Sequence, residues 1–351
     1  MSDVKSFSLA CPLPITHYDQ VLLAHGSGGK LAAELTAQIF LPAFHNPALA
    51  RLDDQAVVDL NGCRVAFTTD SFVVKPLFFP GGDIGSLSVH GTVNDLAMGG
   101  ATPLYLSAGF IIEEGLPIEM LRRIVDSLRL AAAAANVQVV TGDTKVVEKG
   151  SADGLFINTS GIGIVPAGIE LSADQARPGD RILLSGAIGE HGIAIMAQRE
   201  GLEFETTLTS DSAALHTLVS AMLAVPGKIR CMRDPTRGGV SSALNEIAGR
   251  SQVGMELEES AIPIRAEVRG ACEMLGLDPL YVANEGKLVA IVEPALAEPM
   301  LQAMRTHPLA SDAQIIGTVT DSHPGLVTMR CTLGTTRVVD MLAGDQLPRI
   351  C

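Results

Sequence analysis

The chain has 351 residues, of which 47% are hydrophobic and 18% charged, and its formal net charge is -14. This length favours two domains, and the apolar content excludes a disordered chain. The acidic balance disfavours a nucleic-acid partner, because binding to phosphate backbones draws on a surplus of Lys and Arg.

The N-terminal residues and the cysteines bear on the compartment. Residues 1–14 have neither a basic region nor a sustained apolar core, so we predict no signal peptide. No run of about 18 apolar residues occurs, so we predict no membrane span. The cysteines form no CxxC pair, which favours reduced thiols and a cytoplasmic location. They are Cys11, Cys63, Cys231, Cys272, Cys331 and Cys351.

The first half of the chain alternates between strand-like and helix-like segments. We predict strands over residues 64–69, 104–112, 137–140 and 155–164, and helices over residues 86–98 and after Pro117. The helix after Pro117 carries apolar residues at helical spacing, which predicts one buried face. These residues are Ile118, Leu121, Val125 and Leu128.

The second half opens after a polar, turn-forming run over residues 173–180, and we place the domain boundary just before this run. Strands are predicted over residues 181–184, 288–292, 315–319 and 336–339. A helical stripe is predicted at Val240, Ala243, Leu244 and Ile247. The prediction is a mixed α/β and α+β protein with domains over residues 1–168 and 169–340.

Residues 341–351 form a predicted mobile tail, because they contain Gly and Pro and little periodicity. Fully extended, the last eight residues would reach roughly 25 Å, enough to enter a distant pocket.

Acidic residues recur in turns and at the predicted strand ends of the first half. Asp54 lies in a polar turn, Asp70 and Asp143 close predicted strands, Asp83 follows two glycines, and Asp95 follows Asn94. Carboxylates at strand ends suit Mg²⁺. Any one of these segments alone is more typical of an ordinary turn, but their recurrence favours a metal and phosphate site.

Other polar segments remain open to two interpretations. The glycines of residues 26–30 resemble a phosphate loop only loosely, because the Walker A spacing is missing. Lys145 could lie beside phosphates or on an ordinary surface. Residues 233–239 could bind an anion at a helix N-terminus or form a helix-entry loop around Asp234. The histidines show no metal-ligand spacing, and His90 is as well explained by packing as by catalysis.

The chain ends on a thiol, in Leu347-Pro348-Arg349-Ile350-Cys351. This is not a prenylation motif, which needs three residues after its Cys. A thiol on a mobile arm can act as a nucleophile or as a carrier. A terminal Cys without function is the competing interpretation.

Several segments together resemble the hydrogenase maturation carbamoyl dehydratase family, HypE. They are TTDSFVVKPLFFPGGDIG, GTVNDLAMGGATP, GDTKVVEKG, RDPTRGGV, NEGK and the final LPRIC, and they span nearly the whole chain in order. The resemblance implies a two-domain fold like that of aminoimidazole ribonucleotide synthetase. It also implies a homodimer whose N-terminal domains build much of the ATP site.

The resemblance further implies a reaction. A carbamoyltransferase, HypF, loads a carbamoyl group on the terminal cysteine, and the enzyme dehydrates it to a thiocyanate with ATP and Mg²⁺. The cyano group then passes to iron on a HypC–HypD scaffold, for nickel–iron hydrogenase.

The resemblance also assigns roles to residues of this chain. The catalytic residues would be Cys351 as carrier, Glu285 as general base, Lys145 and Asp83. Without the resemblance, Glu285 would be interpreted as a solvated turn carboxylate. ATP and its phosphates would be bound by Asp54, Asp70, Asn94, Asp95, Asp143 and Asp234. Mg²⁺ would be bound by Asp54, Asp70, Asp83, Asp95 and Asp143.

Two alternatives remain. One is a kinase or synthetase of the same superfamily such as selenophosphate synthetase, whose reactive Cys lies in an N-terminal Gly-rich segment. Cys11 fits that pattern poorly, because it precedes Gly26 by a long interval. The other is a scaffold without enzymatic activity, which leaves the acidic residues unexplained.

Overall fold

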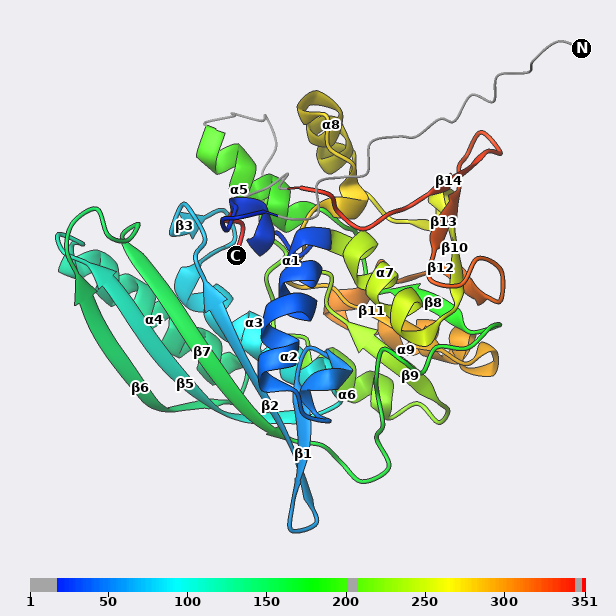
Figure 1. Cartoon of the computed structure of the whole chain (residues 1–351), viewed down its shortest axis with the longest axis horizontal. Coiled ribbons are helices and arrows are strands. Elements are labelled where there is room, and N and C mark those ends of the chain that lie inside the picture. Colours follow the sequence, from blue (N-terminus) through cyan, green and yellow to red (C-terminus); the bar gives the residue numbers. More distant parts are fainter. Residues whose placement is uncertain (1–17, 201–207, 345–348) are drawn as a thin grey trace, which may run out of the picture.

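The computed structural model describes residues 18–200, 208–344 and 349–351, and it divides the strands between two large sheets (Figure 1). The first sheet has the order β1-β2-β7-β5-β6, and all its pairs are antiparallel except β5 with β6. Its strands are β1 (Ala56–Leu60), β2 (Cys63–Phe72), β5 (Thr102–Glu113), β6 (Gln138–Val147) and β7 (Leu155–Ile164). A short hairpin of β3 (Phe78–Phe79) and β4 (Gly82–Asp83) follows β2 in the chain.

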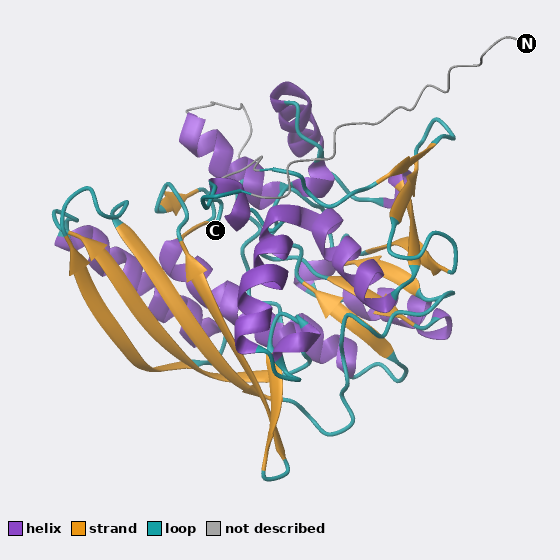
Figure 2. Cartoon of the chain, viewed as in Figure 1, coloured by secondary structure: helices purple, strands orange, loops and turns teal. Residues whose placement is uncertain are grey.

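Among the described residues, helices cover one face of the first sheet (Figure 2). These are α3 (Ile84–Met98) and α4 (Ile118–Ala134). Inward residues alternate along each strand, so that Ala66, Thr68 and Phe72 of β2 are buried while Phe67 between them is exposed. We call the side covered by α3 and α4 the inner face and the opposite side the open face.

The second sheet has the order β14-β13-β10-β12-β8-β11-β9. Its strands are β8 (Arg181–Leu184), β9 (Ile229–Arg233), β10 (Gly254–Glu258), β11 (Val289–Val292), β12 (Gln314–Thr320), β13 (Val327–Arg330) and β14 (Thr336–Val338). Ile182 and Leu184 pack in the core with Val240, whereas Leu183 between them packs in the core with Met300. Apolar cores on both sides explain why β8 and β11 are continuous hydrophobic runs.

The described residues of the second half also form helices. They are α5 (Glu190–Glu200), α6 (His216–Leu223), α7 (Gly239–Ser251), α8 (Ala266–Leu275) and α9 (Ala297–Arg305). In the described N-terminal part, α1 (Lys30–Leu35), the turn Thr36–Phe40 and α2 (Leu41–Phe44) lie between the two sheets in the view of Figure 1. The Lys30 amide donates to the carbonyl of Leu342, and the Arg250 guanidinium donates to the carbonyl of Ala50, so this segment contacts the second half of the chain.

Most predicted elements are present, and three predictions about them were wrong. Asp70 and Asp143 lie inside β2 and β6, because the ladders continue through Asp70–Thr159 and Asp143–Gly109. The buried face of α4 is built on Ile124 and Leu128, together with Ala131 and Ala132. Ile118 and Val125, which we expected on that face, are exposed. The predicted stripe on α7 is confirmed, since its four residues are buried in one core.

No helix in the described ranges is both long and apolar enough to cross a membrane.

Candidate functional site

Four predicted carboxylates converge on the inner side of the first sheet, and we call them the inner cluster. Asp70 points inward from β2, because its ladder partner Thr159 is buried on that face. Asp95 lies on α3 and accepts a hydrogen bond from the Thr68 hydroxyl at 2.8 Å. Asp54 precedes β1, and Asp234 follows β9. The site therefore draws on both halves of the chain.

The inner cluster is electrostatically strained by its own charge. Burial raises the pKa of Asp95 well above its ordinary value, and the charges of Asp234, Asp70 and Asp54 raise it further. Burial and Asp54 likewise raise the pKa of Asp234. Burial raises the pKa of Asp54 to about 6, although Arg233 opposes the change. A bound cation would relieve this repulsion.

Two arginines supply the positive charge nearest the inner cluster. Arg233 contacts Asp54 at 2.9 Å and Glu246 at 2.6 Å. Arg237 lowers the pKa of Asp70, against the larger effect of burial. Both arginines line a pocket of about 160 Å³ together with Asp54 and Asp234. A pocket with guanidinium groups beside carboxylates can bind a phosphate together with its metal ion.

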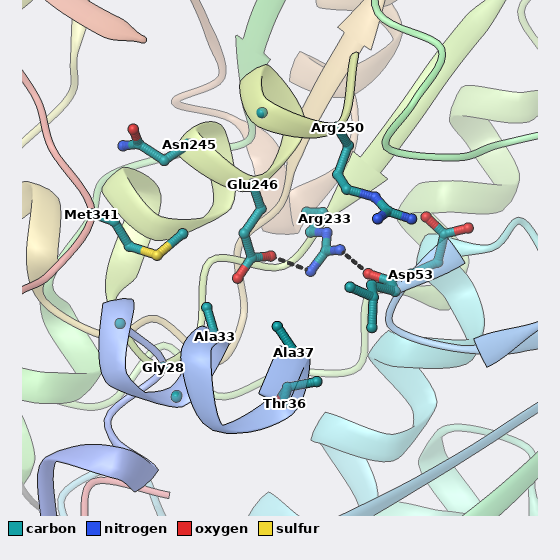
Figure 3. A pocket seen from close by; sticks show the side chains of 14 residues that line it. Gly28, Ala33, Thr36, Ala37, Asp53, Arg233, Asn245, Glu246, Arg250 and Met341 are labelled. Carbon is teal, nitrogen blue, oxygen red and sulfur yellow. Dashed lines mark hydrogen bonds and ion pairs between the residues drawn. The ribbon is translucent and has the colours of Figure 1, made fainter. Parts of the chain in front are cut away.

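A second, larger pocket of about 520 Å³ adjoins the first and shares Gly28, Arg233 and Glu246 with it. It lies between α1 and α7, and Figure 3 shows Arg233 reaching between Glu246 and the segment of Asp53. Gly28 adopts a φ of 73°, and a Cβ there would lie 2.6 Å from the carbonyl oxygen of Arg237. Only glycine permits this approach, so the Gly-rich run is a close-packed part of the pocket wall.

Glu285 is buried, with 2% of its surface exposed, so its interpretation as a solvated turn carboxylate is wrong. Burial raises its pKa well above the ordinary value, and Asp234, Asp70 and Asp211 raise it further. Its Oε1 atom has no hydrogen-bond partner among the described residues. An unpaired buried carboxyl oxygen is free to exchange a proton with a substrate.

The described end of the tail is docked against the molecule. The amide of Val73 donates to a main-chain oxygen of Cys351 at 3.0 Å, and the amide of Lys75 donates to the carbonyl of Arg349 at 3.2 Å. Ile350 is 1% exposed and packs with Phe72 and Val74. Arg349 forms an ion pair with Asp153. Residues 345–348 lie outside the described residues, so the predicted mobility of the tail stays a prediction.

Docking brings the Cys351 thiol to the inner cluster. Burial raises the pKa of this thiol to about 12, Arg237 lowers it, and Glu285, Asp70 and Asp234 raise it further. The docked thiol is therefore protonated at neutral pH and is a poor nucleophile. The arrangement suits a carrier that presents an attached group to the carboxylates.

Asp143 and Lys145 lie elsewhere. They form an ion pair at 2.7 Å in which both side chains are 68% exposed. Their ladder partners on β5 are Gly109 and Ile111, and Ile111 is exposed on the open face. The Lys145 hydrogen bond lowers the pKa of Asp143. Within one chain, the structure does not bring this pair to the inner cluster.

Asp83 and Asn94 have structural contacts. Asp83 caps α3, where its Oδ1 accepts from the amides of Gly85 at 2.7 Å and Ser86 at 3.1 Å. Asn94 is fully buried, and its amide nitrogen donates to the carbonyls of Ala213 and Glu285. Asn94 thus holds the backbone of Glu285, while catalysis and Mg²⁺ binding by Asp83 and phosphate binding by Asn94 stay predictions.

The described residues contain no group of three or more His, Cys, Asp or Glu side chains arranged to hold a metal ion. Mg²⁺ needs only one or two protein carboxylates when phosphates and water complete its shell. The mutual repulsion within the inner cluster fits a site of that kind.

Sequence reasoning missed two residues that shape the site. Asp211 accepts hydrogen bonds from the amides of Glu285 at 3.1 Å and Gly286 at 3.3 Å. His191 contacts the carbonyl of Ile350 at 3.0 Å. Neither lies in a recognisable motif, so only the tertiary structure could reveal them. His90, by contrast, is packed against the Ser212 hydroxyl at 2.9 Å.

Comparison with known proteins identifies the family. Residues 52–165 and 177–329 match the N-terminal and C-terminal domains of the family described as AIR synthase related protein. Carbamoyl dehydratase HypE of Azotobacter vinelandii is 59% identical over 331 residues, which cover 94% of this chain and 97% of that protein.

Two crystal structures are similar over most of their length. HypE in a HypE–HypF complex is 50% identical with a TM-score of 0.84, covering 88% of this chain and 99% of that one. HypE in complex with ATP is 49% identical with a TM-score of 0.80, covering 95% and 100%. The chain is therefore a two-domain AIR synthase related protein and belongs to the carbamoyl dehydratase HypE family.

Proposed function

We propose that this protein dehydrates a carbamoyl group carried on the Cys351 thiol to a thiocyanate, using ATP and Mg²⁺. The single observation that carries the proposal is the docking of Cys351 beside Glu285 and the inner cluster, since both Glu285 and the cluster carboxylates alter the pKa of the thiol. The relatives named carbamoyl dehydratase and the ATP complex of a similar protein support the reaction class. They also favour it over a selenophosphate synthetase or a scaffold.

The chemistry follows from the poor leaving ability of an amide oxygen. Transfer of the γ-phosphoryl group of ATP to the carbamoyl oxygen, with loss of one N–H proton, gives ADP and an imidate phosphate on sulfur. Breaking the C–O bond then releases phosphate, and loss of the second N–H proton leaves the S–C≡N group. The oxygen leaves with the phosphate, so the adduct loses the elements of one water.

Glu285 accepts the N–H proton in this proposal. Its Oε1 atom has no hydrogen-bond partner in the part of the chain that the structure describes, and its raised pKa makes the ionised carboxylate a stronger base than an exposed glutamate. Arg233 and Arg237 would contact phosphate oxygens, and one or two carboxylates of the inner cluster would hold Mg²⁺, which supplies charge neutralisation when bound.

The open face supports a homodimer. Phe67 of β2, Ile162 of β7 and Tyr105 of β5 are direct ladder partners and form an apolar row across three strands. They are 47%, 41% and 45% exposed. A contiguous apolar row of this kind marks an interface, and a second copy would place its own Asp143 and Lys145 against this chain. Lys145 and Asp143 would then act on the ATP phosphates of the partner's site.

The family's partners complete the proposal. A similar protein forms a complex with HypF, so we propose a HypF carbamoyltransferase as the source of the carbamoyl group. A HypC–HypD scaffold would receive the cyano group for nickel–iron hydrogenase. The protein would act in the cytoplasm.

Peptide mass spectrometry of the carbamoylated protein with Mg-ATP tests the reaction. The C-terminal peptide should lose the mass of one water. Glu285→Gln should accept the carbamoyl group and convert it about 10²–10⁴-fold more slowly, since only dehydration needs the base. Cys351→Ala should yield no adduct, whereas Cys63→Ala, which removes an exposed thiol, should behave as wild type. A cyano adduct on another cysteine would refute the carrier role.

A further inference from the structure

His191 connects the docked tail to α5. It is the second residue of α5 and is fully buried. Its Nε2 atom lies 3.0 Å from the carbonyl oxygen of Ile350, and its Nδ1 atom lies 2.8 Å from the Ser210 hydroxyl. The Phe79 ring packs edge-on against the imidazole, with 5.6 Å between centroids. The imidazole is therefore held on three sides.

The two hydrogen bonds define the tautomer. A backbone carbonyl can only accept, so the proton must lie on Nε2. Nδ1 then accepts from the Ser210 hydroxyl, whose oxygen accepts in turn from the Ser212 amide at 3.0 Å. Burial lowers the pKa of His191, which keeps the ring neutral and the tautomer defined. The result is a directed chain of hydrogen bonds ending on the residue before Cys351.

The same two segments hold the backbone of Glu285. Asp211, next to Ser210, accepts from the amides of Glu285 and Gly286. Asp211 also contacts Lys287 at 3.1 Å, and Lys287 contacts Glu190, next to His191, at 3.5 Å. Neighbouring residues on two segments therefore hold the carrier and the base at once.

Two further contacts fix α5 to the segment before Glu285. The amide of Gly189 donates to the Asn284 side chain at 2.7 Å, and the amide of Gly192 donates to the carbonyl of Ala283 at 3.1 Å. A Cβ on Gly286 would lie 1.8 Å from the carbonyl oxygen of Asp211, so only glycine allows the two segments to approach this closely.

We propose that His191 is a positioning residue, which anchors the tail through the Ile350 carbonyl and registers the Cys351 adduct against Glu285. The proposal deepens the dehydratase function and rests on it for its catalytic consequence. Its structural content, the anchoring of the tail, is independent of any reaction.

Alkylation of the unmodified protein without ATP tests the anchor. Iodoacetamide labelling of Cys351 is measured by peptide mass spectrometry relative to Cys63, an exposed thiol in the same chain. His191→Phe keeps a ring against Phe79 but removes the donor, and we expect Cys351 to react about tenfold faster, because a buried carbonyl loses its hydrogen bond. His191→Gln restores an N–H donor and should return labelling toward the wild-type rate.

Two more variants keep the test decisive. Ser210→Ala leaves the imidazole but removes its orienting hydroxyl, and should raise Cys351 labelling less than His191→Phe does. His307→Phe is the matched control, because His307 contacts Thr217, away from the tail, and labelling should not change. Wild-type labelling in His191→Phe, or equal labelling in His191→Gln and His191→Phe, would overturn the proposal.

The catalytic consequence is measured separately. In carbamoylated protein, His191→Phe should convert the adduct more slowly and His191→Gln should recover, while loading of Cys351 stays unchanged in both. If wild type forms no thiocyanate but the labelling pattern holds, the proposed function fails and the anchor stands. If labelling is unaffected while conversion falls in both variants, the anchor fails.

Discussion

Acidic residues on the two faces of the first sheet have pKa values that are shifted in opposite directions. On the inner face, burial raises the pKa of Asp70, and burial together with neighbouring carboxylates raises the pKa of Asp95. On the open face, the pKa of Asp143 is lowered because Lys145, which is largely exposed like Asp143 itself, forms a hydrogen bond to it. The comparison separates carboxylates that need a cation from one that already has a counterion.

This difference bears on where each group can act. The inner cluster and the docked tail belong to one site within the chain, whereas Asp143 and Lys145 reach an ATP site only if another copy covers the open face. The comparison therefore predicts one site with two halves, the inner cluster of one chain and the Asp143–Lys145 pair of another.

Loss of either half should abolish most activity. Asp95→Asn removes a charge that would face Mg²⁺, and we expect ATP turnover to fall by about 100-fold or more. Asp143→Asn should cause a comparable loss in the dimer. Turnover of ATP with saturating Mg²⁺ measures both variants. Normal turnover in Asp143→Asn would confine the site to the inner face.

A charge on the open face should dissociate the dimer. Ile162→Asp places a carboxylate in the middle of the apolar row, where burial in an interface is costly. Analytical ultracentrifugation at micromolar concentration should give a dimer for wild type and a monomer for the variant. Leu326→Asp, at an exposed apolar residue of the second half, serves as the control and should stay dimeric.

Mixing the two inactive variants should restore activity. A mixed dimer of Asp95→Asn and Asp143→Asn subunits contains one site with both defects and one site with neither. After full subunit exchange, about a quarter of all sites should be intact, so about a quarter of wild-type turnover should return. If the mixture stays as inactive as its components, Asp143 does not act across the interface.

The smallest expected effect is on the free energy of unfolding, which should differ between substitutions on the inner face and on the open face. Asp95→Asn removes mutual repulsion inside the inner cluster and retains an oxygen for Thr68, so the free energy of unfolding without metal should rise by about 1 kcal/mol. Asp143→Asn relieves no such repulsion, so its free energy of unfolding should stay within about 0.5 kcal/mol of the wild-type value. Urea unfolding at pH 7 measures both, and destabilisation by Asp95→Asn would contradict the assignment of strain.

The sequence predicted the positions of strands and helices better than the side to which their residues point. Residues 155–164 and 181–184 have the bounds of β7 and β8, because in each the apolar residues follow turn-forming residues directly. The direction of Asp70 and Asp143 depends on the pairing register, which is set by residues distant in the chain. The sequence of α4 allows more than one apolar stripe, and in the folded chain the stripe that contains Ile124 is buried.

The candidate site shows the same limit. Glu285 was identified through resemblance alone, since its burial depends on segments far from it in sequence. The predicted roles of Asp83 in catalysis and Mg²⁺ binding and of Asn94 in phosphate binding stay predictions, but the sequence did not show that Asp83 caps α3 or that Asn94 binds the backbone of Ala213 and Glu285. Such contacts depend on which backbone groups the fold leaves unpaired, and no local pattern encodes them.

The burial of Ile350 stabilises the docked position of the carrier tail. Covering one isoleucine side chain is worth about 1.5–3 kcal/mol, which alone multiplies the ratio of docked to released tail by roughly 10–150, in addition to the hydrogen bonds and the ion pair of the tail. In the proposed reaction, release must follow each turnover, because the cyano group would leave with the tail. A smaller apolar side chain at this position should lower the population of docked substrate. A larger one should slow the release of product until release becomes rate-limiting. Turnover should therefore pass through a maximum as the apolar size of residue 350 increases.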